Sequence, residues 1–246
     1  VLNNKYSKIP NQKSYVLLEN YKENKTVWEN EDCSIIDIGD GILNIEFNSK
    51  MNTIGSDILQ GLNKAIEIGE KNFQGLIIGN EGDNFSAGAD LGMIFMMSVE
   101  QEYEKLDIAI KYFQETMMKL RYSNIPTIAS PHGLTLGGGC ELCMHADKVV
   151  AAAETYIGLV EFGVGLIPGG GGTKEMTLRT SESFKKNDVE LNILRESFLN
   201  IAMAKVSESA YQAFGLGIFQ KEKDYVVVEN KRLLGIAKQE IINIAN

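Results

Sequence analysis

The sequence predicts an α/β fold in which strands alternate with helices. Two short apolar runs, at residues 75–79 and 148–152, are typical of strands that are buried on both faces. Between them, apolar residues recur every three or four positions from Leu106 to Leu120, which is the period of an amphipathic helix. Strands that are separated by helices pair through crossover connections, so the sequence favours a layered α/β domain.

The remaining elements follow from the same periodicities. Residues 41–47 alternate apolar and polar side chains after an Asp-Gly turn and are predicted to form a strand. Ser56 is placed to cap a helix with one apolar face, and residues 126–129 are expected to form a further buried strand. Residues 185–188 are charged and predict an exposed loop. Three more helices are expected, at 196–206, 207–215 and 231–245.

The N-terminal segment differs from the rest in composition. Residues 1–30 are rich in Asn, Lys and Glu and hold few apolar anchors, which indicates a linker or an extended arm. A segment that is ordered by packing on the body is the alternative. The first residue is Val rather than Met, so we expect a processed product or a piece excised from a longer protein.

Composition and charge exclude several classes of function. The chain has 246 residues, of which 44% are hydrophobic and 23% charged, as in an ordinary globular protein. Its apolar stretches are shorter than the roughly 20 residues of a membrane helix. A formal net charge of −9 argues against a nucleic-acid or anionic-membrane binder, but leaves a phosphate-bearing ligand open.

The cysteines indicate a reducing, cytoplasmic environment. Cys33, Cys140 and Cys143 are an odd number in a chain that is too large to need disulfides. The Cys140-x-x-Cys143 spacing lacks a second pair, and His145 would be a poor third ligand, so no metal site is expected.

Two acidic residues lie in glycine-rich segments. Glu141 follows Gly137-Gly138-Gly139, and Glu161 lies between the apolar residues Val160 and Phe162. Apolar surroundings favour the protonated form of a carboxyl group, and two carboxyl groups near one water can exchange the roles of acid and base.

The three glycines can serve a ligand or the packing of the chain. Their N–H groups at a helix start suit a phosphate or a developing oxyanion. The Lys-Ser/Thr of a nucleotide phosphate loop is missing, which disfavours that function. Tight packing of helix against strand is the alternative that remains.

Three motifs together resemble the crotonase (enoyl-CoA hydratase) superfamily. They are Phe-Ser-Ala-Gly-Ala-Asp at 85–90, Gly-Gly-Gly-Cys-Glu-Leu at 137–142, and Glu-x-x-x-Gly-x-Ile-Pro-Gly-x-Gly-Gly-Thr at 161–173. Residues 47–55 and 198–207 further resemble the hydratase portion of a bacterial fused protein, in which a 3-hydroxyacyl-CoA dehydrogenase precedes the hydratase.

The resemblance implies a fold of repeated ββα units with two roughly perpendicular sheets surrounded by helices. It places the domain at residues 31–246. Family members continue for several helices at the C-terminus, so the domain is expected to be truncated there.

The resemblance also implies a reaction and its residues. The reaction is reversible addition of water to trans-2-enoyl-CoA in fatty-acid β-oxidation. The N–H groups of Ala89 and Gly138 would form the oxyanion hole, Glu141 would activate water, and Glu161 would supply the proton at Cα. The residues expected to border coenzyme A are Lys50, Met51, Asn52, Ser86, Ala87 and Leu91.

The expected partners follow from the same resemblance. Coenzyme A would be part of the substrate, and no metal or redox cofactor would be required. NAD would serve only an absent dehydrogenase portion, and a homo-oligomer, typically a trimer, is expected. There are two alternatives to a hydratase. One is an enoyl-CoA isomerase, which commonly needs one carboxylate, and the other is a non-catalytic CoA-thioester-binding or assembly domain.

The sequence departs from the family pattern at two places. Gly92 and Met93 stand where many members carry Lys or Arg, and residues 180–192 are expected to be an insertion or an altered loop.

Overall fold

Repeated units of two strands and a helix build the domain. The computed structural model describes residues 15–245. The first two units are β3 (Ile42–Phe47), β4 (Thr53–Ile54) and α2 (Ser56–Asn72), then β5 (Gly75–Ile78), β6 (Gly88–Ala89), α3 (Leu91–Val99) and α4 (Tyr103–Arg121). The next two are β7 (Thr127–Ala129), β8 (Gly133–Leu136) and α5 (Gly138–His145), then β9 (Lys148–Ala152), β10 (Thr155–Gly158), the 3-10 turn η3 (Glu161–Val164) and α6 (Gly172–Glu182).

The first strand of each unit enters one large sheet and the second strand enters another layer. The large sheet has seven strands in the order β1-β2-β3-β5-β7-β9-β11, and β3, β5, β7 and β9 run parallel. β4 pairs with β6 and β8 with β10, both in parallel. One bridge between Ser86 and Thr135 joins these two short ladders. The predicted repetition of ββα units is confirmed, with the second sheet split into two ladders.

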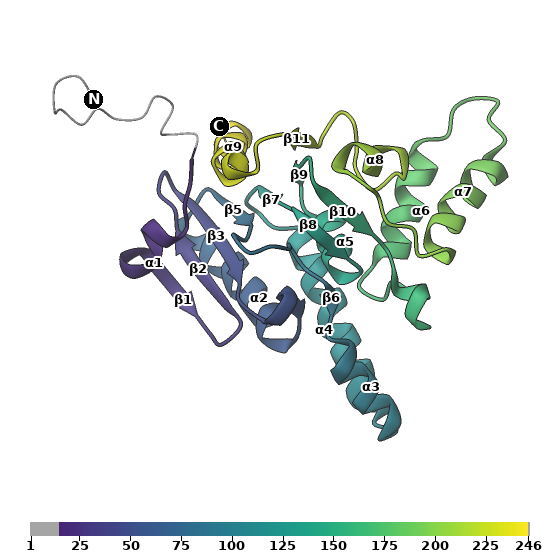
Figure 1. Ribbon diagram of the computed structural model, residues 1–246, viewed down its shortest axis with the longest axis horizontal. Helices are drawn as coiled ribbons and strands as arrows, with labels where there is room; N and C mark the ends of the chain where they lie inside the picture. Colours follow the sequence, from purple (N-terminus) through teal and green to yellow (C-terminus); the bar gives the residue numbers. More distant parts are fainter. Residues whose placement is uncertain (1–14, 246) are drawn as a thin grey trace.

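The large sheet is apolar because helices cover both of its faces. Within β5, Leu76 and Ile78 belong to one buried cluster and Ile77 to the other. α2 supplies the first cluster, and α9 (Leu233–Ala245) supplies the second, on the opposite face (Figure 1). A strand that is buried on both faces needs apolar side chains at successive positions, which explains its continuous apolar run.

The described part of the N-terminal segment belongs to the folded body. Val16 and Leu18 are buried in the cluster under α9. α1 (Glu19–Lys25) and β1 (Thr26–Glu29) follow, and β1 pairs antiparallel with β2 (Cys33–Asp37). The linker predicted for 1–30 therefore does not describe residues 15–29, where packing on the body prevails. Residues 1–14 lie outside the described residues.

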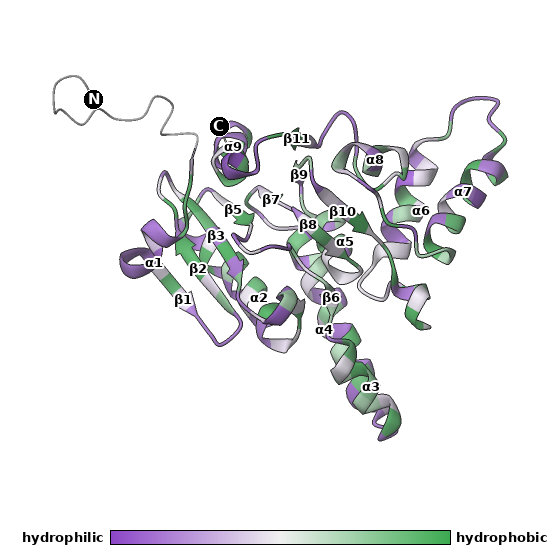
Figure 2. Ribbon diagram, viewed as in Figure 1, coloured by the Kyte–Doolittle hydropathy of each residue, from purple (hydrophilic) through white to green (hydrophobic). Residues whose placement is uncertain are grey.

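Several elements differ in detail from the prediction. α2 begins at Ser56, but its N-cap is Gly55 and no side-chain cap bond forms, so Ser56 is not the cap. Phe113 and Met117 of the apolar stripe are buried, whereas Ile110 is 40% exposed. The reason is that α3 and the first half of α4 project from the body with much of their apolar surface uncovered (Figures 1 and 2).

The C-terminal elements are shifted relative to the prediction. Their bounds are α7 (Glu190–Ala202), α8 (Ala210–Gly215), β11 (Tyr225–Val227) and the 3-10 turn η4 (Asn230–Arg232) before α9. The exposed loop at 185–188 is confirmed. The strand β11 was not predicted; it pairs in parallel with β9 at the edge of the large sheet. Among residues 15–245, no helix is both long enough and apolar enough to pass through a bilayer.

Candidate active site

The three consecutive glycines at the start of α5 are required by backbone geometry and by close neighbours. Gly137 has φ +50°, in the region that favours glycine. A Cβ atom on Gly138 would lie 2.9 Å from Cζ of Phe113, and one on Gly139 would lie 2.8 Å from Cβ of Ser86. The tight packing that the sequence offered as the alternative role of these glycines is therefore present. Because the glycines carry no side chains, the backbone of this turn is also not covered by side chains of its own.

The two amides that were expected to bind an oxyanion lie close together. A Cβ atom on Gly138 would lie 3.4 Å from the nitrogen of Ala89, and one on Gly88 would lie 3.3 Å from the nitrogen of Gly138. Gly138 is the first residue of α5. Its N–H has no acceptor within the helix and lies at the positive end of the helix dipole. The ends of β6 and α5 therefore bring both predicted donors to one place.

Glu141 is held by a second glycine turn. The residue is 2% exposed, and its Oε1 accepts a hydrogen bond from the N–H of Gly172 at 2.8 Å. A Cβ atom on Gly170 would lie 2.6 Å from Oε2 of Glu141. Glycine at this position therefore lets the backbone approach the carboxylate. N–H donors favour the ionised form of this carboxyl group.

Glu161 reaches the same place from η3. A Cβ atom on Gly137 would lie 3.2 Å from Oε1 of Glu161. Both carboxyl oxygens of Glu161 are buried and find no hydrogen-bond partner among the described residues. Buried polar atoms are normally satisfied, so these two oxygens are available to a water or a ligand.

Burial prepares the two carboxyl groups for proton transfer. Burial raises the pKa of Glu161 to about 7. Burial and the negative charge of Glu161 raise the pKa of Glu141 to about 8, against the opposing effect of the glycine N–H donors. The two groups interact, so they titrate as a pair. Near neutral pH such a pair can both accept and release a proton.

The predicted coenzyme A segments are adjacent, but their side chains differ in exposure. Ala87 N donates to the carbonyl of Met51 at 3.1 Å, and Ser86 Oγ donates to the carbonyl of Asn52 at 2.7 Å. Ser86 is fully buried, so only its backbone is placed to border a ligand. Asn52 is 9% exposed and donates to the carbonyl of Asn84.

Four of the six residues predicted to border coenzyme A are at least partly exposed. Met51 and Leu91 are 48% and 46% exposed, Lys50 is also exposed, and Ala87 is half-buried. Side-chain contacts to a ligand are therefore open to these four residues, while Ser86 and Asn52 join the two segments.

The sequence model of a family described as "Enoyl-CoA hydratase/isomerase" matches residues 37–185, which include Ala89, Gly138, Glu141 and Glu161. The chain belongs to the enoyl-CoA hydratase/isomerase family.

Two curated relatives carry the names of fatty-acid enzymes. A Bacillus subtilis (strain 168) protein named "Probable 3-hydroxyacyl-CoA dehydrogenase" is 45% identical over 235 residues, which cover 95% of this chain and 29% of the relative. A Rickettsia felis protein, named as a candidate "fatty acid oxidation complex trifunctional enzyme", is 36% identical over 178 residues, which cover 72% of this chain and 25% of the relative. The chain thus spans less than a third of the length of either relative.

Solved structures confirm the crotonase fold. The crystal structure of enoyl-CoA hydratase from Thermoplasma volcanium GSS1 matches with a TM-score of 0.69 and 23% sequence identity, over 88% of this chain and 78% of that chain.

Two neighbours of the carboxylates in this hydratase/isomerase domain were not predicted from sequence. The ring of Phe113 lies against Gly138 and Gly170, and Nε2 of Gln114 donates to the carbonyl of Gly169 at 2.7 Å. In the sequence, Phe113 is one member of a helical apolar stripe, and no sequence signal separates it from the core residues Met117 and Leu120.

An ionic cluster around the buried residues His145 and Glu175 lies behind Glu141 and also escaped prediction. Nδ1–H of His145 donates to the carbonyl oxygen of Glu141 at 2.7 Å, and Nε2 lies 3.2 Å from Nζ of Lys174. Glu175 is 1% exposed and lies 2.9 Å from Nη1 of Arg121 and 3.1 Å from Nζ of Lys174. Burial lowers the pKa of His145 to about 4, so the imidazole is neutral at pH 7.

The cysteines of α5 are part of the packing. Cys140 and Cys143 are buried free thiols, and burial raises the pKa of each thiol. In the described part of the chain, no group of three or more His, Cys, Asp or Glu side chains is arranged to hold a metal ion.

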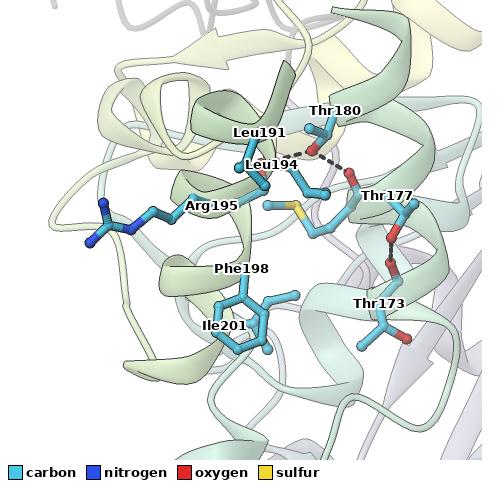
Figure 3. Close-up of a pocket in the computed structure, with 10 residues that line it drawn as sticks. Thr173, Thr177, Thr180, Leu191, Leu194, Arg195, Phe198 and Ile201 are labelled. Carbon is cyan, nitrogen blue, oxygen red and sulfur yellow. Dashed lines mark hydrogen bonds between the residues drawn. The ribbon is translucent and has the colours of Figure 1, made fainter. Parts of the chain in front are cut away.

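A separate apolar cavity of about 430 Å³ lies between α6 and α7 (Figure 3). Its lining includes Thr173, Met176, Thr177 and Thr180 from α6 and Leu191, Leu194, Phe198 and Ile201 from α7. None of the predicted catalytic or CoA-binding residues lines it.

Proposed function

We propose that this domain adds water reversibly to the double bond of a trans-2-enoyl-CoA thioester, giving a 3-hydroxyacyl-CoA. The observation that carries this proposal is the pair of buried carboxyl groups, Glu141 and Glu161, beside the amides of Ala89 and Gly138. Hydration needs one group that takes a proton from water and one that gives a proton to carbon. It also needs N–H donors that stabilise the negative charge developing on the thioester oxygen. Two buried carboxyl groups and two neighbouring backbone amides are groups of these kinds, which supports the proposal.

The amides would act on the carbonyl. As water adds to Cβ, negative charge develops on the thioester oxygen, and preorganised N–H donors of Ala89 and Gly138 would stabilise it. By analogy with other oxyanion holes, each donor would contribute roughly 3 kcal/mol to the stability of the transition state.

The carboxyl groups would move the protons. Near neutral pH, with pKa values of about 8 and about 7, the two carboxyl groups share one proton, which lies on either of them. In the reactive arrangement the proton is on Glu161, and the ionised Glu141, held by the N–H of Gly172, would accept a proton from the water whose oxygen bonds to Cβ. Protonated Glu161 would deliver its proton to Cα, so that one H and one OH enter the product. The pair then returns to its starting state by exchanging one proton with solvent. Positioned acid–base groups of this kind each contribute roughly 10²- to 10⁴-fold in rate.

The coenzyme A portion would lie along the loop at Lys50, Met51 and Leu91, whose side chains are exposed. Lys50 would supply positive charge to the phosphates in a chain whose net charge is −9. The names of the two relatives support a longer chain in fatty-acid oxidation. There, a dehydrogenase portion would oxidise the 3-hydroxyacyl-CoA product with NAD.

The test is hydration of trans-2-butenoyl-CoA, followed by the loss of absorbance of the conjugated thioester. Wild-type protein is expected to turn over, and Glu141→Gln and Glu161→Gln are expected to lose at least about 10²-fold in kcat. Glu222→Gln, in an exposed turn before β11, is the matched control and should keep full activity.

Three other outcomes would change the assignment. Full activity in both site variants would overturn the proposed mechanism. Conversion of trans-3-enoyl-CoA by Glu141→Gln, without hydration by wild type, would favour an isomerase. Thioester binding without turnover of either substrate would favour a non-catalytic binding domain.

A further inference from the structure

Phe113 bridges the two glycine turns of the site. A Cβ atom on Gly138 would lie 2.9 Å from its Cζ, and one on Gly170 would lie 2.5 Å from its Cδ1. The ring therefore touches the backbone of both turns, and side chains larger than hydrogen at Gly138 and Gly170 would displace it. The adjacent residue Gln114 bonds to the carbonyl of Gly169, so α4 holds the second turn through two consecutive residues.

Each end of the ring lies at a reacting group. Gly138 carries one of the proposed oxyanion donors. Gly170 faces Glu141, because a Cβ atom on Gly170 would lie 2.6 Å from Oε2 of Glu141. Phe113 is 9% exposed, so the ring is almost wholly packed between the two turns and the core.

In the proposed complex, the position of Phe113 determines which acyl carbons the ring would contact. With the thioester oxygen at Gly138 and the attacked Cβ near Glu141, the acyl chain must leave the site beyond Cβ. The aromatic ring packs against the Gly138 turn and against the Gly170 turn, which faces Glu141. The first carbons after Cβ would therefore run against the ring.

We propose that Phe113 is a specificity-determining residue, whose ring limits the space for acyl carbons next to Cβ and selects chains that are unbranched at Cγ. The inference rests on the proposed function, because it assumes that an acyl-CoA thioester occupies the site.

The experiment compares 4-methyl-trans-2-pentenoyl-CoA, which is branched at Cγ, with trans-2-butenoyl-CoA. For wild type, kcat/KM is expected to favour the unbranched substrate. Phe113→Ala should raise the ratio of branched to unbranched kcat/KM by about tenfold or more, since pocket space for one methyl or methylene group is worth roughly that factor. Phe113→Leu keeps an apolar contact with both turns and should shift the ratio in the same direction by a smaller factor.

Phe198→Ala is the matched control. Phe198 is an aromatic residue that lines the α6–α7 cavity (Figure 3) and is 66% exposed. It should leave the ratio unchanged. If Phe198→Ala shifts the ratio and both Phe113 variants do not, the acyl chain lies in that cavity and the inference about Phe113 is wrong.

Binding separates this inference from the proposed reaction. Calorimetry gives Kd for saturated 4-methylpentanoyl-CoA and butanoyl-CoA without any turnover. A wild-type protein that binds both but hydrates neither enoyl-CoA would refute the proposed function, while a Kd ratio that shifts in Phe113→Leu would still support the role of Phe113. An unchanged Kd ratio and an unchanged kcat/KM ratio in folded Phe113→Leu would overturn that role. A protein that binds neither thioester would refute both.

Discussion

Replacing Glu141 by Gln should remove activity and yet stabilise the protein at alkaline pH. The pKa of Glu141 is raised from 4.5 to about 8 by burial and by the charge of Glu161. Between these two pH values the folded state binds more protons than the unfolded state. Wild-type stability therefore falls as pH rises from about 4.5 to 8, and Gln at this position removes that dependence.

The size of the effect follows from the shift. A difference of 8 − 4.5 = 3.5 pKa units corresponds to roughly 5 kcal/mol of unfolding free energy above pH 8. The amide of Gln can still accept from the N–H of Gly172 through its oxygen. Its NH₂ group would oppose the N–H donors at Gly170 and Gly171, at a cost of about 1–3 kcal/mol. Glu141→Gln should therefore be about 2–4 kcal/mol more stable than wild type at pH 9, and no more stable at pH 5.

The assay is urea unfolding of wild type and Glu141→Gln at half-unit pH steps from 5 to 9, with Glu222→Gln as the exposed control. The unfolding free energy of the variant relative to wild type should rise steadily with pH, while that of the control should stay flat. A difference for Glu141→Gln that is the same at pH 5 and pH 9 would refute the argument that a buried, ionised Glu141 costs stability.

Three further predictions concern the surroundings of the site. Glu175→Gln should lower the unfolding free energy at pH 7 by about 2 kcal/mol, because it removes the buried carboxylate that pairs with the half-buried Arg121; urea unfolding that shows no loss would contradict this. His145, neutral when folded and with its pKa lowered from 6.5 to about 4, should make wild type less stable as pH falls from 6.5 to 4, by roughly 3 kcal/mol, and His145→Gln should flatten that slope in the same assay. Gly133→Ala should lower the thermal midpoint by several degrees, because φ is +54° and backbone atoms fill the Cβ position; Gly55→Ala, with no atom within 4 Å of its Cβ position, should change it little.

Local periodicity was sufficient for the main elements. The strands at 75–79 and 148–152 and the helix ending near Leu120 were predicted because their apolar residues repeat with the period of the element. The N-terminal segment was misjudged because its anchors are few. Val16 and Leu18 gain their burial from α9, more than 200 residues later in the chain, and no local pattern reports such a contact.

The exposure of α3 and of the first half of α4 escaped prediction for a similar reason. An apolar stripe predicts that a helix has one face to cover, but not whether the described chain covers it. Leu106 to Leu120 repeat evenly, and only the half that lies over α2 and α5 is buried.

The sequence by itself determined which residues could carry the chemistry. Three motifs supplied the family, the two acids and the two glycine turns, because backbone approach to a carboxylate or an oxyanion admits little besides glycine. Only the tertiary structure decided the burial, the pKa values and the neighbours of those residues. The raised pKa values of Glu141 and Glu161 come from burial among elements that are distant in sequence. The ring of Phe113 reaches both turns only because α4 crosses the starts of α5 and α6, and a contact between three helices leaves no trace in the pattern of any one of them.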